Sequence, residues 1–326
     1  MVEMMQAGVS SESGLAIRQV LRPAPGNGQV LVKVIAAGMN RADLNAAKGA
    51  GVASKDSLGK PIGMEWAGII AEIGPGVKGL AAGDRVMCSG AGGYAEYAVA
   101  DAGRTLKIDD GFDMKQAAAL PLALLTAHDA LVVNGRLRPG ESVLVQGASS
   151  AVGLMTLQIA RIMGAVVIAG SSSNAKRRTR LAEFGATLVV DPSDASWPDE
   201  LRAATGAKGV DVVVDMVSGP ALNLCMKAAA VRGRIVNVGR LGGVKAEFDF
   251  DLHAAKRLDY IGVTFRTRTL AEVREIVTRM RDDLWDHVMS GRLSLPIDTD
   301  FPLAEAASAH ERMATNAHFG KIVLVP

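Results

Sequence analysis

The sequence contains few cysteines and few aromatic residues. Two cysteines, Cys88 and Cys225, occur in 326 residues, too few for a disulfide framework or for a zinc cage built from cysteines. Aromatic residues make up 4% of the chain, which argues against a protein that stacks nucleic-acid bases on aromatic rings. The formal net charge of +2 indicates that no polyanionic partner such as nucleic acid is bound.

The sequence also lacks the segments that place a chain in a membrane or send it across one. It has no run of about 18 or more apolar residues, the usual minimum for a spanning helix. Residues 1–10 have neither the basic region nor the apolar core of a secretion signal. We therefore expect a cytoplasmic protein with no membrane partner.

Residues 142–153 contain the feature around which the chain is organised. An apolar run at residues 143–145 predicts a buried strand, a turn of small residues follows, and apolar residues then recur at helical spacing. Strand, tight turn and helix in this order are typical of a dinucleotide-binding unit, because small side chains let backbone N–H groups approach a pyrophosphate at the helix N-terminus. We expect cofactor contacts from Ala148, Ser149, Ser150, Ala151, Val152 and Gly153.

The glycine fingerprint of such units is incomplete in this chain. Ala148 and Ser150 stand where the first two glycines are usual, and Gly153 retains the third. The hydroxyl of Ser150 has two interpretations, as a donor to a phosphate or as a group that merely fits the turn.

The second predicted strand, residues 166–169, indicates which dinucleotide is bound. An acidic residue after this strand would bind the ribose hydroxyl of NAD, but the segment from Ala165 to Ala182 contains none. Hydroxyls and a basic cluster take its place and suit the 2′-phosphate of NADPH. The residues of this segment expected to bind NADPH are Gly170, Ser171, Ser172, Lys176 and Arg177.

The spacing of strands and helices predicts two kinds of domain. Short strands at 29–36, 69–73, 85–87 and 94–100, punctuated by glycine and proline, predict a small barrel, and Asp113 is placed to cap a helix that runs to Ala119. Strands at 188–190, 210–216 and 234–238 then alternate with helices at 176–184, 198–205 and 220–231. This alternation predicts a doubly wound parallel sheet with helices on both faces. Helices at 270–290 and 303–314 lead to a last strand, 322–325, which we expect to return to the first domain.

Taken together, the motifs resemble one known family over nearly the whole chain. They include Asn40-Arg41-x-Asp43, Gly63-x-Glu65-x-x-Gly68, Gly83-Asp84-Arg85-Val86, Gly93-Tyr94-Ala95-Glu96-Tyr97, Leu120-Pro121 with Leu125-Thr126, Gly185-Ala186, Gly233-Arg234 and Gly320-Lys321. The chain resembles the zinc-lacking, zeta-crystallin-like quinone oxidoreductases of the medium-chain dehydrogenase/reductase superfamily. The resemblance implies an α/β fold in which a Rossmann sheet, residues 120–263, is inserted in a GroES-like β-barrel catalytic domain formed by residues 1–119 and 264–326.

Departures from the zinc-containing members of that superfamily predict that no metal is bound. Alcohol dehydrogenases with zinc carry a cysteine where this chain has Asn40 and a histidine where it has Met64. Many relatives also have a tyrosine near the substrate in the segment that matches residues 45–52, and this chain has none. The histidines show no ligand spacing and are expected at the surface or at helix caps; they are His128, His253, His287, His310 and His318.

The resemblance also implies roles for individual residues. Asn40 would orient the substrate or the nicotinamide ribose, and Thr126 would pack near the nicotinamide. The end of the fifth strand would reach the nicotinamide side through Asn237, Val238, Gly239 and Arg240. Weaker candidates for the cofactor or the cleft are Phe265, Arg266 and Lys321.

The function implied is an NADPH-dependent, zinc-independent reduction of a quinone or another conjugated carbonyl. Two alternatives stay open from the sequence. One is an enoyl reductase that saturates a C=C bond beside a carbonyl or thioester, and the other is an NADPH-binding structural or sensing protein with little turnover. Relatives pair the edge strands of their Rossmann sheets, so the apolar segment at residues 260–263 predicts a homodimer.

Overall fold

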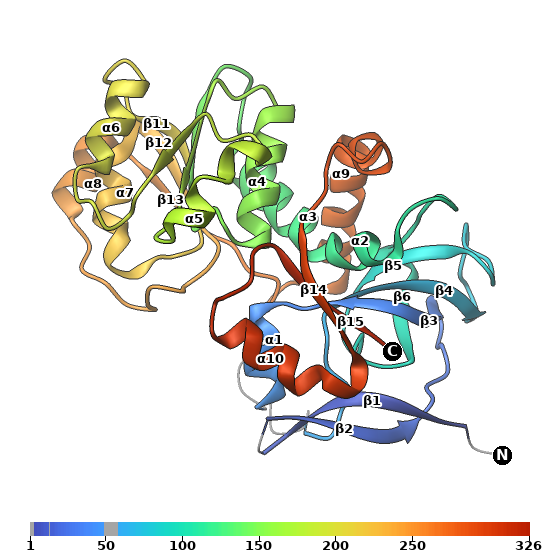
Figure 1. Ribbon diagram of the computed structural model, residues 1–326. Coiled ribbons are helices and arrows are strands. Elements are labelled where there is room, and N and C mark those ends of the chain that lie inside the picture. Colours follow the sequence, from blue (N-terminus) through green and yellow to red (C-terminus); the bar gives the residue numbers. More distant parts are fainter. Residues whose placement is uncertain (1–2, 13, 49–57) are drawn as a thin grey trace. The chain divides into compact units, whose positions relative to one another are not determined.

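The computed structural model describes residues 3–12, 14–48 and 58–326, which divide into two compact units. The first contains the chain up to Leu122 and from Thr269 onward, and the second runs from Ala123 to Arg268 (Figure 1). The sequence predicted the divisions after residues 119 and 263. The segment 45–52, in which the sequence lacks the family tyrosine, extends past Lys48 into residues outside the described ones.

The first unit is built on a seven-stranded sheet of order β14-β15-β3-β4-β5-β7, with β6 paired to β3. β15 pairs with both β14 and β3, so the last strand returns to the first unit, as the sequence predicts. These strands are β3 (Gln29–Gly38), β4 (Glu65–Ile73), β5 (Arg85–Ser89), β6 (Tyr97–Asp101), β7 (Thr105–Lys107), β14 (Ile297–Pro302) and β15 (Lys321–Val325).

A separate antiparallel hairpin and several helices complete the first unit. The hairpin consists of β1 (Met4–Ser11) and β2 (Gly14–Leu21). The helices are α1 (Arg41–Ala47), α2 (Met114–Ala119), α9 (Leu270–Met289) and α10 (Ala306–Ala314), and α3 (Pro121–His128) continues into the second unit. Asp113 caps α2 through a hydrogen bond from the Gln116 N–H, as predicted.

The second unit contains a six-stranded parallel sheet of order β10-β9-β8-β11-β12-β13. Numbered from β8, this order is 3-2-1-4-5-6, the arrangement of dinucleotide-binding Rossmann domains. The strands are β8 (Ser142–Gln146), β9 (Val167–Ser171), β10 (Leu188–Val190), β11 (Val210–Asp215), β12 (Ala229–Asn237) and β13 (Asp259–Gly262).

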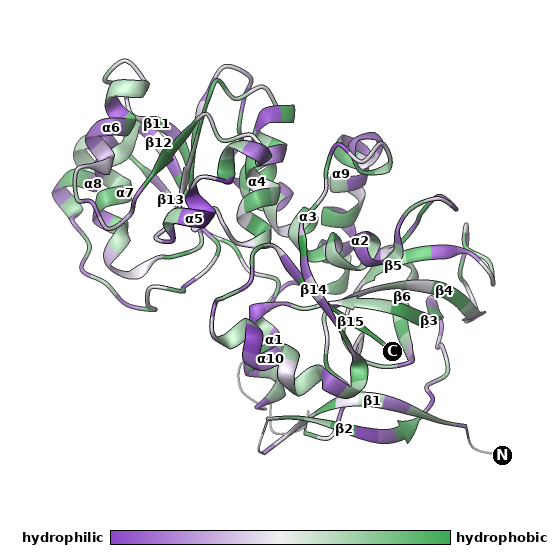
Figure 2. Cartoon of the chain, in the orientation of Figure 1, coloured by the Kyte–Doolittle hydropathy of each residue, from purple (hydrophilic) through white to green (hydrophobic). Residues whose placement is uncertain are grey.

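Helices cover both faces of this parallel sheet, which explains why its strands are apolar on both sides. In Figure 1, α4 (Ala151–Ile162) lies on the face opposite α6 (Trp197–Ala204), α7 (Leu222–Ala228) and α8 (Phe250–Lys256). Trp197 of α6 and Cys225 of α7 are fully buried in one core with Leu144 and Val213 of the sheet. Figure 2 shows the apolar strands and the more polar outer helix surfaces.

Several predicted elements have different bounds in the structure. The helix predicted over 220–231 ends at Ala228, because β12 already begins at Ala229. The helix predicted over 176–184 is two short pieces, α5 (Ala175–Arg178) and a 3₁₀ turn (Leu181–Phe184). The strand predicted from residue 94 begins at Tyr97, because Tyr94 turns into the core, where it is fully buried.

Candidate active site

The turn between β8 and α4 is closed by the side chain of Ser150. Its Oγ accepts a hydrogen bond from the Gly153 N–H at 3.1 Å and donates one to the Gly147 carbonyl at 2.9 Å. Ser150 is therefore the N-cap of α4. Of the two interpretations open from the sequence, these contacts favour the hydroxyl that fits the turn.

The start of α4 has the form of a phosphate-binding site. Ala151 and Val152 are its first two residues, and N–H groups at these positions have no acceptor within a helix. A Cβ on Gly153 would lie 2.6 Å from the Cα and the carbonyl oxygen of Ala148. Only glycine lets the helix start so close to the turn, so this segment fits the pyrophosphate of a dinucleotide.

The end of β9 lies directly beside this turn. The Ser171 hydroxyl accepts a hydrogen bond from the Gly147 N–H at 3.1 Å and donates one to the Gln146 side chain. The Ser172 hydroxyl donates to that of Ser149 at 3.1 Å, and both Ser171 and Ser172 are buried. Gly170 packs closely there, since a Cβ on it would lie 3.1 Å from the Ala148 Cβ.

The basic cluster after β9 separates into residues that hold the fold and residues exposed to solvent. Arg178 donates to the Ser172 carbonyl at 2.6 Å and forms an ion pair with Asp191 at 2.9 Å. Lys176 is exposed and Arg177 is half-buried on α5, which Asn174 caps. Arg178 is thus held within the fold, and the binding of an added phosphate by Lys176 and Arg177 stays a prediction.

The ends of β11 and β12 form a polar network. The Asn237 amide donates to the Ser218 hydroxyl, which donates to the Gly239 carbonyl at 2.7 Å. One oxygen of Asp215 accepts hydrogen bonds from the N–H groups of Val217 and Ser218 at 2.8 and 2.9 Å, and burial raises the pKa of this carboxyl.

Met216, which follows β11, connects this network to the glycine-rich turn. Its sulfur lies 3.4 Å from the Ser150 hydroxyl, and a Cβ on Gly239 would lie 2.5 Å from its carbonyl oxygen. The structure thus brings together the predicted turn, the end of β9 and the Asn237–Gly239 segment, as expected for ligands bound at the carboxyl ends of parallel strands.

The remaining candidates of the second unit lie in less defined surroundings. Thr126 is half-buried on α3, and Arg240 and Arg266 are exposed. Phe265 is half-buried, with the Arg268 guanidinium 5.7 Å from the centre of its ring.

In the first unit, Asn40 is held by a buried ion pair between Lys321 and Glu65. The Lys321 ammonium donates to the Asn40 Oδ1 at 2.8 Å, and the Asn40 Nδ2 donates to a Glu65 oxygen at 2.8 Å. The other Glu65 oxygen accepts a hydrogen bond from the Leu122 N–H at 2.7 Å. Because lysine only donates, these contacts fix the orientation of the amide and leave one of its N–H bonds for another acceptor.

Asp43 and Tyr94 form a second buried pair next to Asn40. One Asp43 oxygen accepts hydrogen bonds from the Tyr94 hydroxyl at 2.7 Å and from the Asn40 backbone N–H at 2.8 Å. The other oxygen is buried without a hydrogen-bond partner among the described residues. Burial raises the pKa of Asp43 from 3.8 to about 7, against the lowering effect of these hydrogen bonds.

Two of the histidines are buried, although the sequence predicts the histidines at the surface or at helix caps. His128 is fully buried, because α3 is covered on almost all sides. His310 lies on the buried face of α10, with its ring 6.1 Å from that of Tyr94, and burial lowers its pKa to about 4. Over residues 3–12, 14–48 and 58–326, no three His, Cys, Asp or Glu side chains group as metal ligands.

Comparisons with known proteins match both units. Residues 26–110 match the alcohol dehydrogenase GroES-like domain, and residues 151–281 match the zinc-binding dehydrogenase family. A quinone oxidoreductase of Rattus norvegicus is 34% identical over 309 residues, 94% of this chain and 92% of that protein. The chain belongs to the quinone oxidoreductase family. It is therefore an oxidoreductase of the medium-chain dehydrogenase/reductase superfamily.

Two further comparisons concern a solved structure with the same fold and a much longer protein that contains a similar segment. The structure of Escherichia coli quinone oxidoreductase complexed with NADPH superposes with a TM-score of 0.87, at 25% identity over 99% of both chains. A phenolphthiocerol/phthiocerol polyketide synthase of Mycobacterium tuberculosis is 32% identical over 95% of this chain, but over only 14% of its own length. In the present chain, no described helix is long and apolar enough to cross a membrane.

Several residues of the site in this family member were not predicted from the sequence. Glu65 and Tyr94 belong to motifs of the family but had no predicted role in the site. Neither Asp215 nor Ser218 was a predicted site residue. Ser218 carried one usable signal, because it directly precedes a Gly-Pro pair. Its backbone has φ of 57° and ψ of −154°, a conformation that non-glycine residues rarely adopt and that is common at functional sites.

Proposed function

We propose that the chain reduces a quinone or another conjugated carbonyl with NADPH and without zinc. The observation that carries this proposal is the carboxyl end of the parallel sheet. There, Ala151 and Val152 begin α4, the Ser172 hydroxyl donates to that of Ser149, and the segment from Ala165 to Ala182 contains no carboxylate. The relatives support it, since one is named a quinone oxidoreductase and another was solved with NADPH.

The chain's own residues account for the binding of this cofactor. The start of α4 would hold the pyrophosphate, and Lys176 with Arg177 would bind the 2′-phosphate. The Asn237–Gly239 segment and Thr126 would contact the nicotinamide side. When bound, NADPH supplies the hydride.

The type of substrate follows from Asn40. A simple ketone needs a metal or an acid to stabilise the alkoxide that develops during reduction. At the positions of two zinc ligands in alcohol dehydrogenases, this chain has Asn40 and Met64. A quinone or an enone spreads the incoming charge over its own π-system, so the remaining Asn40 N–H is a sufficient donor.

Acceptor specificity tests the proposed function. We expect NADPH oxidation with quinones or enones to continue at full rate after dialysis against a metal chelator, because no step uses a metal. The measurement is steady-state NADPH absorbance with a panel of quinones, enones and saturated ketones, before and after chelation. Loss of activity on chelation, restored by zinc, would overturn the proposal.

The match to a polyketide synthase favours a second candidate, enoyl reduction of an α,β-unsaturated thioester. It would use the same cofactor site and the same Asn40 donor. The acceptor panel separates the two when it includes a crotonyl thioester. A protein that binds NADPH but turns over none of these acceptors would instead be the structural or sensing protein considered from the sequence.

Cofactor preference is expected to depend on Lys176 and Arg177. Neutralising both (K176Q/R177Q) should lower affinity for NADPH by about 10- to 100-fold, since a charge-assisted contact contributes about 1.5–3 kcal/mol, while NADH affinity stays constant. Fluorescence titration with each dinucleotide measures this. The matched control R202Q/K208Q removes two exposed cations of the same unit. Equal use of NADH and NADPH by the wild type would contradict the prediction.

We also propose that the protein is a homodimer joined through β13. This strand ends the six-stranded sheet, and Tyr260 on it is 40% exposed. An open apolar edge strand favours pairing with another strand. Light scattering should give twice the 33.9 kDa chain mass, and a Tyr260→Lys variant should shift the distribution toward the monomer. A monomeric wild type at micromolar concentration would refute this.

A further inference from the structure

A cavity of about 420 Å³ lies at the amino end of the parallel sheet, opposite the glycine-rich turn. Ser142, Val210 and Asp259 begin β8, β11 and β13 at this end. The residues that line the cavity are Arg136, Arg138, Glu141, Asp211, Val231, Arg232, Arg234, Arg257 and Asp259. None of them belongs to the proposed cofactor site, so a ligand bound here is independent of the proposed function.

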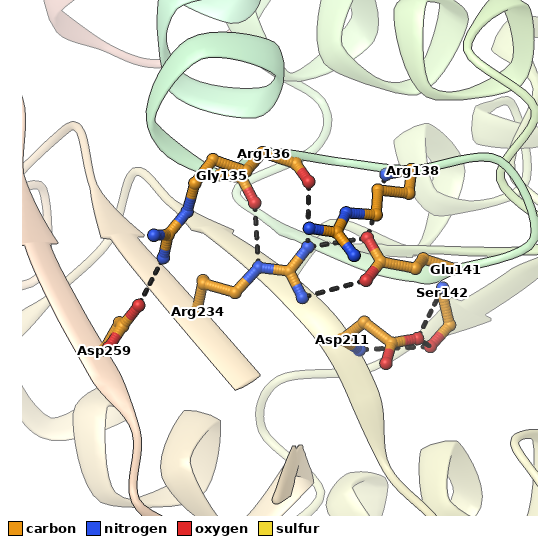
Figure 3. Close-up of polar contacts among 8 residues, drawn as sticks. All are labelled: Gly135, Arg136, Arg138, Glu141, Ser142, Asp211, Arg234 and Asp259. Atoms are coloured by element: carbon orange, nitrogen blue, oxygen red, sulfur yellow. Dashed lines mark hydrogen bonds and ion pairs between the residues drawn. The ribbon is translucent and has the colours of Figure 1, made fainter. Parts of the chain in front are cut away.

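Each acidic side chain of this cavity already has partners (Figure 3). Arg234 donates two hydrogen bonds to Glu141, at 2.6 and 3.0 Å, and Arg136 forms an ion pair with Asp259. Asp211 accepts hydrogen bonds from the backbone N–H and the hydroxyl of Ser142, at 2.8 and 2.7 Å.

Three arginines remain in excess over these pairs. The side chains of Arg138, Arg232 and Arg257 are exposed and make no hydrogen bond or ion pair within the part of the chain that the structure describes. The lining contains five arginines and three carboxylates, a net charge of +2. Like charges gathered in one cavity repel each other, so an anion bound among them would be stabilised.

The backbone around the cavity is irregular at several of the arginines that line it. Val210 of β11 pairs with Ala229 of β12, but Val212 pairs with Arg234, so residues 230–233 bulge out of the sheet and carry Arg232. Arg136, Arg232 and Arg257 have φ of 51°, 65° and 50°. They are three of the six non-glycine residues with positive φ among those described. Unfavourable conformations of this kind concentrate at binding sites.

We propose that this cavity binds the phosphate group of a small phosphate monoester. A fully ionised phosphate monoester carries two negative charges, which matches the excess charge of the lining, and arginine binds phosphate through two parallel hydrogen bonds. The cavity lies in the range of about 300–1,000 Å³ typical of small-molecule sites. It exceeds the size of a phosphate ion, and the side chain of Val231, which is 55% exposed, is available to an apolar ester group.

Calorimetric titration with inorganic phosphate and with phenyl phosphate tests this site. We expect both to bind, phenyl phosphate more tightly because it can also contact Val231. The triple variant R138Q/R232Q/R257Q should bind both at least about ten-fold more weakly. The control R279Q/R281Q/R292Q removes three exposed arginines of the other unit and should leave the affinity unchanged.

The proposal would be overturned by absence of binding to the wild type, by unchanged affinity in the triple variant, or by an equal loss in the control. Binding that persists in the triple variant would place the phosphate elsewhere, for example at the glycine-rich turn. If the triple variant unfolds, single Arg→Gln variants decide the question, because each should then weaken binding by about three-fold or more. Binding of inorganic phosphate with no gain for phenyl phosphate would reject the monoester in favour of the free ion.

Discussion

Replacing Lys321 by methionine is expected to lower the free energy of unfolding by about 3–5 kcal/mol. Lys321 is 1% exposed and its partner Glu65 is fully buried. Methionine fills a similar volume but removes the cation, and Glu65 then keeps only the donors from Asn40 and Leu122. A buried carboxylate without its counter-ion is strongly destabilising. Denaturant unfolding followed by tryptophan fluorescence measures the loss, because Trp66 lies in the core of the same unit.

Two further variants distinguish the cost of a buried, unpaired charge from a nonspecific loss of stability. Lys115 forms an ion pair with Asp300 at 2.9 Å in the same unit, but both side chains are more than 40% exposed. Lys115→Met should therefore cost no more than about 1 kcal/mol. The double variant Glu65→Gln/Lys321→Met leaves no buried charge at the pair and should recover much of the stability. A Lys321→Met protein as stable as the wild type would show that this ion pair does not stabilise the fold.

Replacing Asn40 by alanine should lower kcat/KM for quinones and enones by about ten-fold or more. One hydrogen bond to developing charge contributes about 1.5–3 kcal/mol, and the remaining N–H of this amide is the proposed donor. The affinity for NADPH should change less, because the phosphate contacts lie in the other unit. Steady-state kinetics and a cofactor titration on the same preparation measure both quantities.

The matched control for Asn40 is Asn223→Ala. Asn223 is a half-buried asparagine of α7 that accepts one backbone hydrogen bond, from Asp249 at 3.2 Å. Its loss should leave kcat/KM unchanged. Thermal unfolding of both variants shows whether lost activity reflects lost structure. An Asn40→Ala enzyme that unfolds like the wild type and keeps full turnover on every accepted acceptor would exclude the role proposed for the amide.

The Rossmann unit was largely predictable because its signals are local. The strands β8 and β11 each contain an uninterrupted run of three apolar residues, and the small residues before Gly153 leave room for a turn. The hairpin of β1 and β2 was missed, although Met5, Ala7 and Val9 alternate inward. Gln6 and Gly8 separate these side chains, and because Gly8 is not polar, the alternation of polar and apolar residues is weak. Helix α1 was also missed, since it has only seven residues and depends on the Asn40–Asp43 cap.

The contacts of the candidate site were less predictable than its elements. Lys321 was expected near the cofactor or the cleft, and the structure shows it in the ion pair with Glu65, which lies 256 positions away in the sequence. Arg178 and Lys176 belong to one basic run in the sequence, but the structure places Arg178 in an ion pair with Asp191. Such partners come from strands brought together by the whole sheet, and no local pattern records them.

The buried carboxyl of Asp43 makes the stability of the first unit depend on proton uptake. Its pKa is about 7 in the folded chain and 3.8 in the reference state. Between these values the folded chain holds a proton that the unfolded chain has released. The contribution of Asp43 to stability is therefore greatest below about pH 4, declines as the pH rises and levels off above about pH 7. This carboxyl in the first turn of α1 thus exchanges its proton near neutral pH, one hydrogen bond away from Asn40.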